Sequence, residues 1–372
     1  MKASTRRLML ILLGSLLPLV ACFGCNRGSE GPTGFSGFSP SEKRTQIAFL
    51  VNGPVSDWGY NYSQNEGRLF VDQALGKEVR TGVLENIPET SEAERVMERA
   101  IEAGVKVVIA TSFGYQDATI AVAGRHPDVR FLQAWGFKRS PNVGSYSVKM
   151  YEVWYLMGIV AGRMTKTNKL GIVAAHPIPP MKWQLNAYVL GARSVNPKVT
   201  ATVTFINHWF DPVLAGQATE ALINQGHDVV CGVLDSSVGV AQAAEKRGVW
   251  LIGHNADLSG FAPARCLTGT RWLWGKLYYD QIRLMLQGKW KGGEDATGGL
   301  KEGYVGMTGF SAAVPGEVQR EVQTARQKII DGKLAAYAGP ISDNTGKERV
   351  PAGKTLSHEE IMGIDWLVEG VR

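Results

Sequence analysis

The order of apolar and polar residues follows a regular alternation from Thr45 onward. Short apolar runs, rich in β-branched residues, alternate with longer stretches in which apolar residues recur at helical spacing. In the first half of the chain the runs predict strands over 46–52, 79–85, 105–111 and 129–134, and the spacing predicts helices over 63–75, 91–103 and 116–125. A series of this kind predicts a doubly wound parallel sheet with right-handed crossovers.

The same alternation starts again after the apolar stretch 152–163. It predicts strands over 169–174, 200–207, 229–234 and 250–253, and helices over 181–195, 215–224 and 238–247. The two halves are therefore of one kind. We expect an α/β protein with two doubly wound parallel-sheet lobes and one cleft between them, an architecture suited to trapping a ligand.

The remaining pattern assigns the rest of the chain to these lobes. Helices are expected over 271–287 and 315–331 and a strand over 304–308, so the chain should cross to the first lobe near Thr268 and return near Tyr304. The expected domains are an N-terminal lobe of 45–148 plus 269–303, a C-terminal lobe of 149–268 plus 304–341, and a C-terminal tail of 342–372. In that tail Ser-x-x-Glu predicts a capping box at the start of a short helix over 357–362.

The first residues resemble an export signal. A basic start, an apolar run over 8–20 and the sequence Leu19-Val-Ala-Cys22 predict a lipoprotein signal peptide over 1–21, with lipidation of Cys22. The apolar run is shorter than the ~20 residues that a membrane-spanning helix needs. An ordinary secretory peptide, cut nearby without lipid, is the alternative. Residues 22–44 are rich in Gly, Ser and Pro and predict a flexible tether.

Composition and charge exclude other classes. Of 372 residues, 44% are hydrophobic and 20% charged, which is ordinary for a globular protein. The net charge of +6 includes the leader's Lys2, Arg6 and Arg7, and the remainder is too small and dispersed to indicate nucleic acid as a partner. Cys231 lies in an apolar run and is expected to be buried, while its spacing from Cys266 leaves a disulfide between them open.

Candidate binding residues follow the predicted strands. Ligands of open α/β sheets bind outside the carboxyl ends of the strands, where this chain gathers aromatic, amide and carboxylate side chains. The candidates in these loops are Asp57, Trp58, Tyr60, Asn61, Phe113, Asp117, Trp209, Asp211, Asp235, Asn255 and Asp257. Each has a purely structural alternative: the aromatic rings can cap a sheet or fill the core, and an aspartate that opens a helix can cap it.

Several of these loops together resemble the basic membrane protein family. The segments are the leader motif, Asp57-x-Gly-Tyr-Asn61, Ser112-Phe-Gly-Tyr-Gln-Asp117, Phe210-Asp-Pro212 and Asn255-Ala-Asp257, in order over 45–341. That family comprises substrate-binding lipoproteins of ABC importers, typified by the purine nucleoside receptor. The resemblance implies a type I periplasmic-binding-protein fold that holds a purine between aromatic rings and delivers it to a permease in the cytoplasmic membrane.

The resemblance also implies roles and shows two departures. Trp58, Tyr60, Phe113 and Trp209 would stack on the purine, and Asp57, Asn61, Asp117, Asp211 and Asp235 would bond its edges. Asn255-Ala-Asp257 replaces the Asp-Ser-Asp of nucleoside-binding relatives, and Trp272 stands where they carry a lysine. Because the lost groups would contact ribose hydroxyls, the departures predict a site for a bare base, adenine favoured, or one whose sugar end is closed off. A purine nucleoside stays open as the ligand, since Arg271 could supply a donor instead.

Signatures of catalysis are missing from the sequence. The six histidines show no helical metal-site spacing, no Cys-x-x-Cys follows the leader, and there is no Gly-x-Ser-x-Gly elbow or Walker loop. We therefore expect no enzyme, no metal and no cofactor. The expected protein is a monomer held by Cys22 on the periplasmic or extracellular face of the cell membrane. A ligand sensor for a signalling partner and an exported nucleoside hydrolase stay open as alternatives.

Overall fold

The computed structural model describes residues 37–372. The predicted signal peptide and Cys22 lie outside this range. Within it, no helix combines the length and apolar character needed to cross a membrane.

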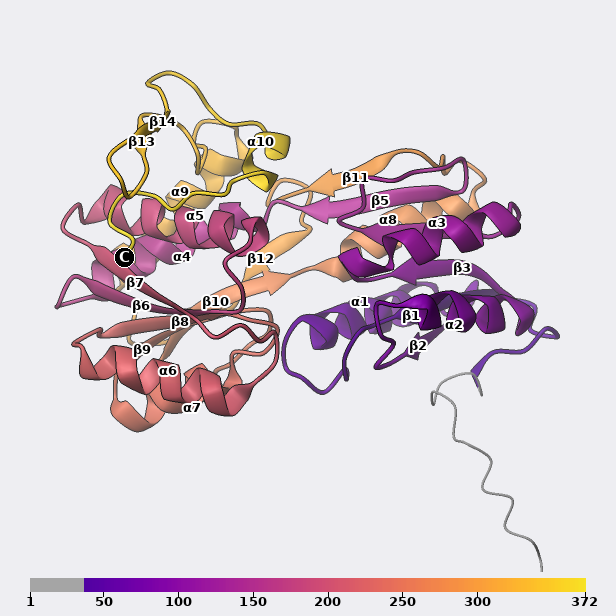
Figure 1. The fold of residues 1–372 in the computed structure, drawn as a ribbon, viewed down its shortest axis with the longest axis horizontal. Helices are drawn as coiled ribbons and strands as arrows, with labels where there is room; N and C mark the ends of the chain where they lie inside the picture. Colours follow the sequence, from indigo (N-terminus) through magenta and orange to yellow (C-terminus); the bar gives the residue numbers. More distant parts are fainter. Residues whose placement is uncertain (1–36) are drawn as a thin grey trace, which may run out of the picture. The chain divides into compact units, whose positions relative to one another are not determined.

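The first lobe is built on a six-stranded sheet with the strand order β11-β5-β4-β3-β1-β2, and all of its pairs are parallel (Figure 1). Its strands are β1 (Thr45–Leu50), β2 (Val79–Leu84), β3 (Val105–Ala110), β4 (Arg130–Ala134), β5 (Val143–Val148) and β11 (Asp295–Gly298). Its helices are α1 (Tyr60–Leu75), α2 (Ser91–Glu102), α3 (Gln116–Arg125) and α8 (Trp274–Leu286), with the short turn η2 (Phe113–Tyr115) before α3.

Both faces of this sheet are buried, which explains the continuous apolar runs of its strands. Side chains of β1 alternate between two clusters: Ile47 and Phe49 join the cluster that contains α1 and α8 residues, whereas Ala48 and Leu50 join the one under α2 and α3. Successive strand residues point to opposite faces, so a strand covered on both sides needs apolar residues at every position.

The second lobe repeats the design with the order β12-β10-β9-β8-β6-β7. Its strands are β6 (Lys169–Ala174), β7 (Thr200–Phe205), β8 (Val229–Val233), β9 (Trp250–Gly253), β10 (Cys266–Trp272) and β12 (Val305–Met307), of which β12 is antiparallel. Its helices are α4 (Met150–Met164), α5 (Pro179–Val195), α6 (Pro212–Asn224), α7 (Val238–Arg247) and α9 (Gly316–Ile330). The predicted α/β fold with two parallel-dominated sheets is confirmed.

Three local expectations were wrong. Strands β5 and β11 were not predicted, because Ser145 and Ser147 interrupt the apolar pattern of the first and β11 is only a short edge strand. The helix expected over 271–287 begins at Trp274, since Arg271 and Trp272 still pair with β12 as the end of β10. Trp272 therefore ends a strand of the second sheet instead of starting a helix.

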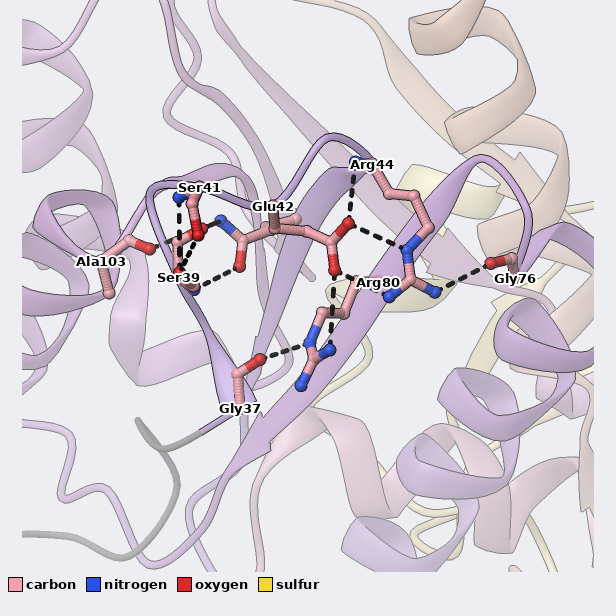
Figure 2. A network of polar contacts seen from close by, with 9 residues as sticks. Gly37, Ser39, Ser41, Glu42, Arg44, Gly76, Arg80 and Ala103 are labelled. Carbon is pink, nitrogen blue, oxygen red and sulfur yellow. Dashed lines mark hydrogen bonds and ion pairs between the residues drawn. The ribbon is translucent and has the colours of Figure 1, made fainter.

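The last residues of the expected tether are packed against the first lobe (Figure 2). Phe38 is buried in the cluster under α2 and α3. The Glu42 carboxylate accepts hydrogen bonds from Arg44, at 2.7 Å from Nη2, and lies 3.6 Å from the Arg80 guanidinium. The tether predicted over 22–44 is thus wrong for residues 38–44, because Phe38 has a place in the core.

Residues 342–372, which we call the C-terminal strap, fold onto the second lobe. The strap includes β14 (Glu348–Val350), paired with β13 (Ile341–Ser342), and α10 (His358–Met362). The predicted capping box is confirmed, with Ser357 and Glu360 bonded to each other's main chain. Near the chain end, Ala201 of β7 donates to the Gly370 carbonyl at 2.8 Å, which fastens the strap to the edge of the sheet.

Candidate ligand-binding site

A cavity of about 900 Å³ lies between the two lobes, at the carboxyl ends of their strands. This volume is near the top of the range of small-molecule pockets. Aromatic rings and a few polar groups line it from both sides. The aromatic members are Tyr60, Phe113, Trp135, Phe137, Trp183, Trp209 and Trp272.

Tyr60, Trp135 and Trp272 lie together in the cavity lining, and we call them the aromatic cluster. The Tyr60 hydroxyl donates to the Thr111 carbonyl at 2.8 Å and accepts from the Trp135 indole nitrogen at 3.1 Å. The Trp272 ring meets Tyr60 and Trp135 edge-on, with centroids 5.9 and 6.1 Å apart, and stacks on Trp274 at 5.1 Å. The hydroxyl and indole hydrogen bonds fix the rings, so the aromatic cluster is preorganised.

Asn255 and Trp272 satisfy each other's polar groups. The Trp272 indole nitrogen donates to the Asn255 side-chain oxygen at 2.6 Å. The Asn255 amide nitrogen donates to the carbonyls of Leu234 and Asp235 at 2.8 and 3.0 Å. Both amide hydrogens and the indole hydrogen are therefore used within the protein, and neither side chain has a donor left for a ligand.

Asp235 is the unusual acid of the cavity. Its carboxyl lies at the cavity wall and has no hydrogen-bond partner among residues 37–372, although its backbone carbonyl accepts from Tyr60 N at 2.9 Å. Burial, followed by the nearby carboxylates of Asp57 and Glu89, raises the pKa of Asp235 to about 8. Near neutral pH the group is therefore mostly un-ionised and carries one donor and one acceptor.

The two lobes touch at Gly59 and Asp235. A Cβ on Gly59 would lie 1.3 Å from the Asp235 carbonyl oxygen, so only glycine allows this approach. Beside it Trp58 meets Phe261 of the second lobe edge-on at 5.4 Å and stacks on Tyr62 at 4.7 Å. Trp58, expected to stack on the ligand, lies outside the cavity lining and packs between the lobes.

Asp57 and Asn61 are also outside the cavity lining. The buried Asp57 carboxylate accepts from the backbone nitrogens of Gly59, Asn61 and Tyr62 at 2.8, 3.1 and 2.9 Å, and from the Asn61 amide at 3.0 Å. Burial raises the Asp57 pKa and these bonds oppose the rise. The pair shapes the start of α1 and positions Tyr60.

Of the remaining candidates, the aromatic side chains line the cavity and the acids of the loops do not. Phe113 and Trp209, both well exposed, line the cavity, and Trp209 meets His176 edge-on at 4.9 Å. The acids do not: Asp211 caps α6 by accepting from Leu214 N at 2.9 Å, Asp117 pairs with Lys138, and Asp257 accepts from Ser259 N. Arg271 pairs with Glu66 at 2.6 Å and does not line the cavity either.

Several lining residues were missed from the sequence. Trp135 and Phe137 follow β4, so the rule that ligands meet strand ends would have found them. His254 follows β9; burial lowers its pKa to about 3, and the neutral ring bonds Thr270 Oγ1 at 2.7 Å. The strap contributes His358, Glu359 and Met362, for which no local signal existed.

Two further observations concern sulfur and metals. Cys231 and Cys266 are both buried and free, so the disulfide left open by their spacing is not formed. Between residues 37 and 372, no group of three or more His, Cys, Asp or Glu side chains is placed to hold a metal ion.

Two α/β lobes around a ligand cavity define a binding protein of the periplasmic type. A solute-binding protein of an ABC transporter system from Conexibacter woesei has the same fold, with a TM-score of 0.68 at 20% identity, covering 78% of this chain and 98% of that one. The family model of PnrA-like ABC transporter substrate-binding proteins, Bmp, matches residues 44–338. The chain belongs to this family, which confirms the resemblance, and the family's role is substrate binding and not catalysis.

Two relatives carry names that state a ligand. A purine-binding protein of Brucella abortus is 35% identical over 335 residues, covering 90% of this chain and 95% of the relative. A protein of Haloferax volcanii, provisionally named an ABC transporter glucose-binding protein, is 34% identical over 313 residues, covering 84% and 79%. Relatives at the same level of identity thus bear names of different ligand classes, and the cavity's own chemistry has to distinguish them.

Proposed function

We propose that this substrate-binding protein captures a purine base, adenine in preference, and delivers it to the permease of an ABC importer while anchored to the membrane through lipidated Cys22. The observation that carries the proposal is the carboxyl of Asp235, which lies at the wall of an aromatic cavity and has no hydrogen-bond partner among residues 37–372. The Brucella abortus relative, named a purine-binding protein, supports the same ligand class.

The hydrogen-bond pattern favours adenine over other purines. Along one edge adenine presents a ring-nitrogen acceptor beside an amine donor, whereas guanine presents two acceptors there. A protonated carboxyl offers one donor and one acceptor, so Asp235 matches adenine at both positions. If the purine meets Asp235 with its N7 edge, guanine would place O6, a second acceptor, against one oxygen of Asp235, and an unsatisfied polar group in a closed cavity costs about 1–3 kcal/mol.

Aromatic rings supply the remaining affinity. Trp209 and Phe113 enter the cavity from opposite lobes and are exposed, so their faces are available to a flat heterocycle. Stacking of a base on an aromatic side chain is worth ~1–3 kcal/mol.

The bare base is favoured because the groups that replace the ribose contacts are occupied. Trp272 donates its indole hydrogen to Asn255, and Asn255 donates its amide hydrogens to two backbone carbonyls. A ribose placed against them would find no free donor. A purine nucleoside is the second candidate, because about 900 Å³ leaves room beyond a base and polar side chains line the end of the cavity near the strap.

Thermal shift with adenine, guanine, adenosine and glucose tests the proposal. A ligand at a hundredfold excess over Kd raises stability by about 2.7 kcal/mol, which is easily seen. Adenine should give the largest shift. Asp235→Ala should abolish most of it, whereas Asp235→Asn should retain it, because an amide keeps one donor and one acceptor at this position. A shift with glucose and none with any purine would refute the proposal.

A further inference from the structure

The C-terminal strap forms part of the cavity wall. His358, Glu359 and Met362 of α10 line the cavity together with Ser147 of β5. His358 Nε2 lies 3.2 Å from Ser147 Oγ, so α10 reaches from the second lobe to the first. The family model ends at residue 338, and the strap therefore lies outside the part of the chain that this model describes.

The strap is held firmly enough to act as a wall. Ile361 and Ile364 are buried in the main core cluster. The buried amide of Asn186 on α5 donates to the Trp366 carbonyl at 2.9 Å and accepts from Val368 N at 2.9 Å. These contacts lie within α10 and just after it, and they fix its position against the cavity.

Two adjacent glutamates of α10 have different surroundings. Glu360 closes the capping box with Ser357 and pairs with Lys354 at 2.7 Å. Glu359 lines the cavity, and its carboxylate has no hydrogen bond or ion pair with any of residues 37–372. A carboxylate with free acceptors in the cavity lining is available to a ligand.

We propose that the strap binds the part of the ligand that projects beyond the purine ring. In a purine nucleoside, Glu359 accepts hydrogen bonds from the pentose hydroxyls. An acidic side chain that accepts from ribose hydroxyls is an established arrangement in nucleotide-binding proteins. Asn255 and Trp272 have no donors to spare, so the sugar of a nucleoside has to find its partners elsewhere. The inference rests on the proposed function, because the base must lie against Asp235, Phe113 and Trp209 for its sugar to reach the strap.

Calorimetric titration of the full chain with adenine, adenosine and 2′,3′-dideoxyadenosine tests the inference. Glu359→Ala should weaken adenosine binding by about tenfold, the usual loss for a hydrogen bond to a charged group, and leave adenine unchanged. Because dideoxyadenosine lacks the hydroxyls, its affinity should not respond to the substitution. Glu348→Ala is the matched control, since Glu348 is an exposed glutamate of the strap that does not line the cavity.

The outcomes separate the two proposals. If the wild-type protein binds adenine but Glu359→Ala changes the affinities for adenosine and dideoxyadenosine equally, or changes neither, the strap does not read the sugar. Undetectable adenosine binding by a wild-type protein that binds adenine would also overturn the inference, and would leave the proposed function standing. If none of the three ligands binds, the proposed function itself fails.

Discussion

Gly59→Ala places a methyl group in the contact between the lobes. In the structure the added carbon would lie 1.3 Å from the Asp235 carbonyl oxygen and 2.4 Å from its carbon. Ordinary carbon contacts begin near 3.4 Å, so the two segments would have to separate by about 2 Å. That movement would break the hydrogen bond from Tyr60 N to the same oxygen, now 2.9 Å long.

The cost falls on the arrangement in which the lobes touch. Loss of one hydrogen bond costs about 0.5–1.5 kcal/mol and overpacking about 1–3 kcal/mol, together roughly 2–4 kcal/mol. If the lobes close around the ligand, the same free energy is lost from binding, a decrease of roughly 30- to 1000-fold in adenine affinity. The ligand-free protein can avoid the clash by opening, so its melting temperature should change little.

Calorimetry with adenine and a melting curve without ligand measure the two effects separately. Gly260→Ala is the control, because nothing lies within 4 Å of a Cβ at this exposed position in the second lobe. Wild-type affinity in Gly59→Ala would refute the reasoning, since it would show that ligand binding does not need this contact. A large drop in the ligand-free melting temperature would show that the lobes do not open to relieve the clash.

Three further predictions concern the anchor, the stacking face and the buried acid. Cys22→Ala should move the protein from the membrane fraction to the soluble fraction, and unchanged fractionation would contradict lipidation. Trp209→Ala should weaken adenine binding by ~1–3 kcal/mol in a calorimetric titration, and an unchanged Kd would exclude stacking on this ring. The raised pKa of Asp235 means that stability falls as pH rises from about 4 to about 8; Asp235→Asn should therefore gain melting temperature relative to wild type across that range, and parallel pH profiles would contradict the assignment.

The fold could be predicted because the spacing of apolar residues, which differs between helices and buried strands, is visible in short stretches of the sequence. Ile47 and Phe49 face the helices on one side of the sheet, and Ala48 and Leu50 face the helices on the other side. Each of these positions must therefore be apolar, and this is visible in the sequence of β1. Strand β5 escaped prediction because its serines bond other side chains: Ser145 reaches Asp295 at 2.8 Å, a partner far along the chain.

The sequence identified the loops that form the candidate site, but it did not show which residues of each loop line the cavity. The rule that ligands meet strand ends led to Tyr60, Phe113, Trp209 and Asp235, all of which line the cavity. It led equally to Asp57, whose carboxylate is used by three backbone nitrogens. An aspartate before a helix can cap it or bind a ligand, and only the three-dimensional path of the loop separates the two.

The strap shows a second limit. Glu359 is held at the cavity by contacts of its neighbours with residues far away in the sequence: His358 bonds Ser147, and Trp366 and Val368 bond Asn186. The sequence therefore predicted only a C-terminal tail for residues 342–372, whereas in the structure this segment forms part of the cavity wall.

The most direct test of the central claim is a calorimetric comparison of adenine with adenosine, guanosine and inosine at pH 7, with displacement of each by the others. Adenine should bind most tightly, because Asp235 matches its edge while Asn255 and Trp272 offer no free donor to a ribose. Displacement of adenine by the nucleosides at equal concentration would contradict the preference for a base, and absence of binding by every purine would contradict the ligand class.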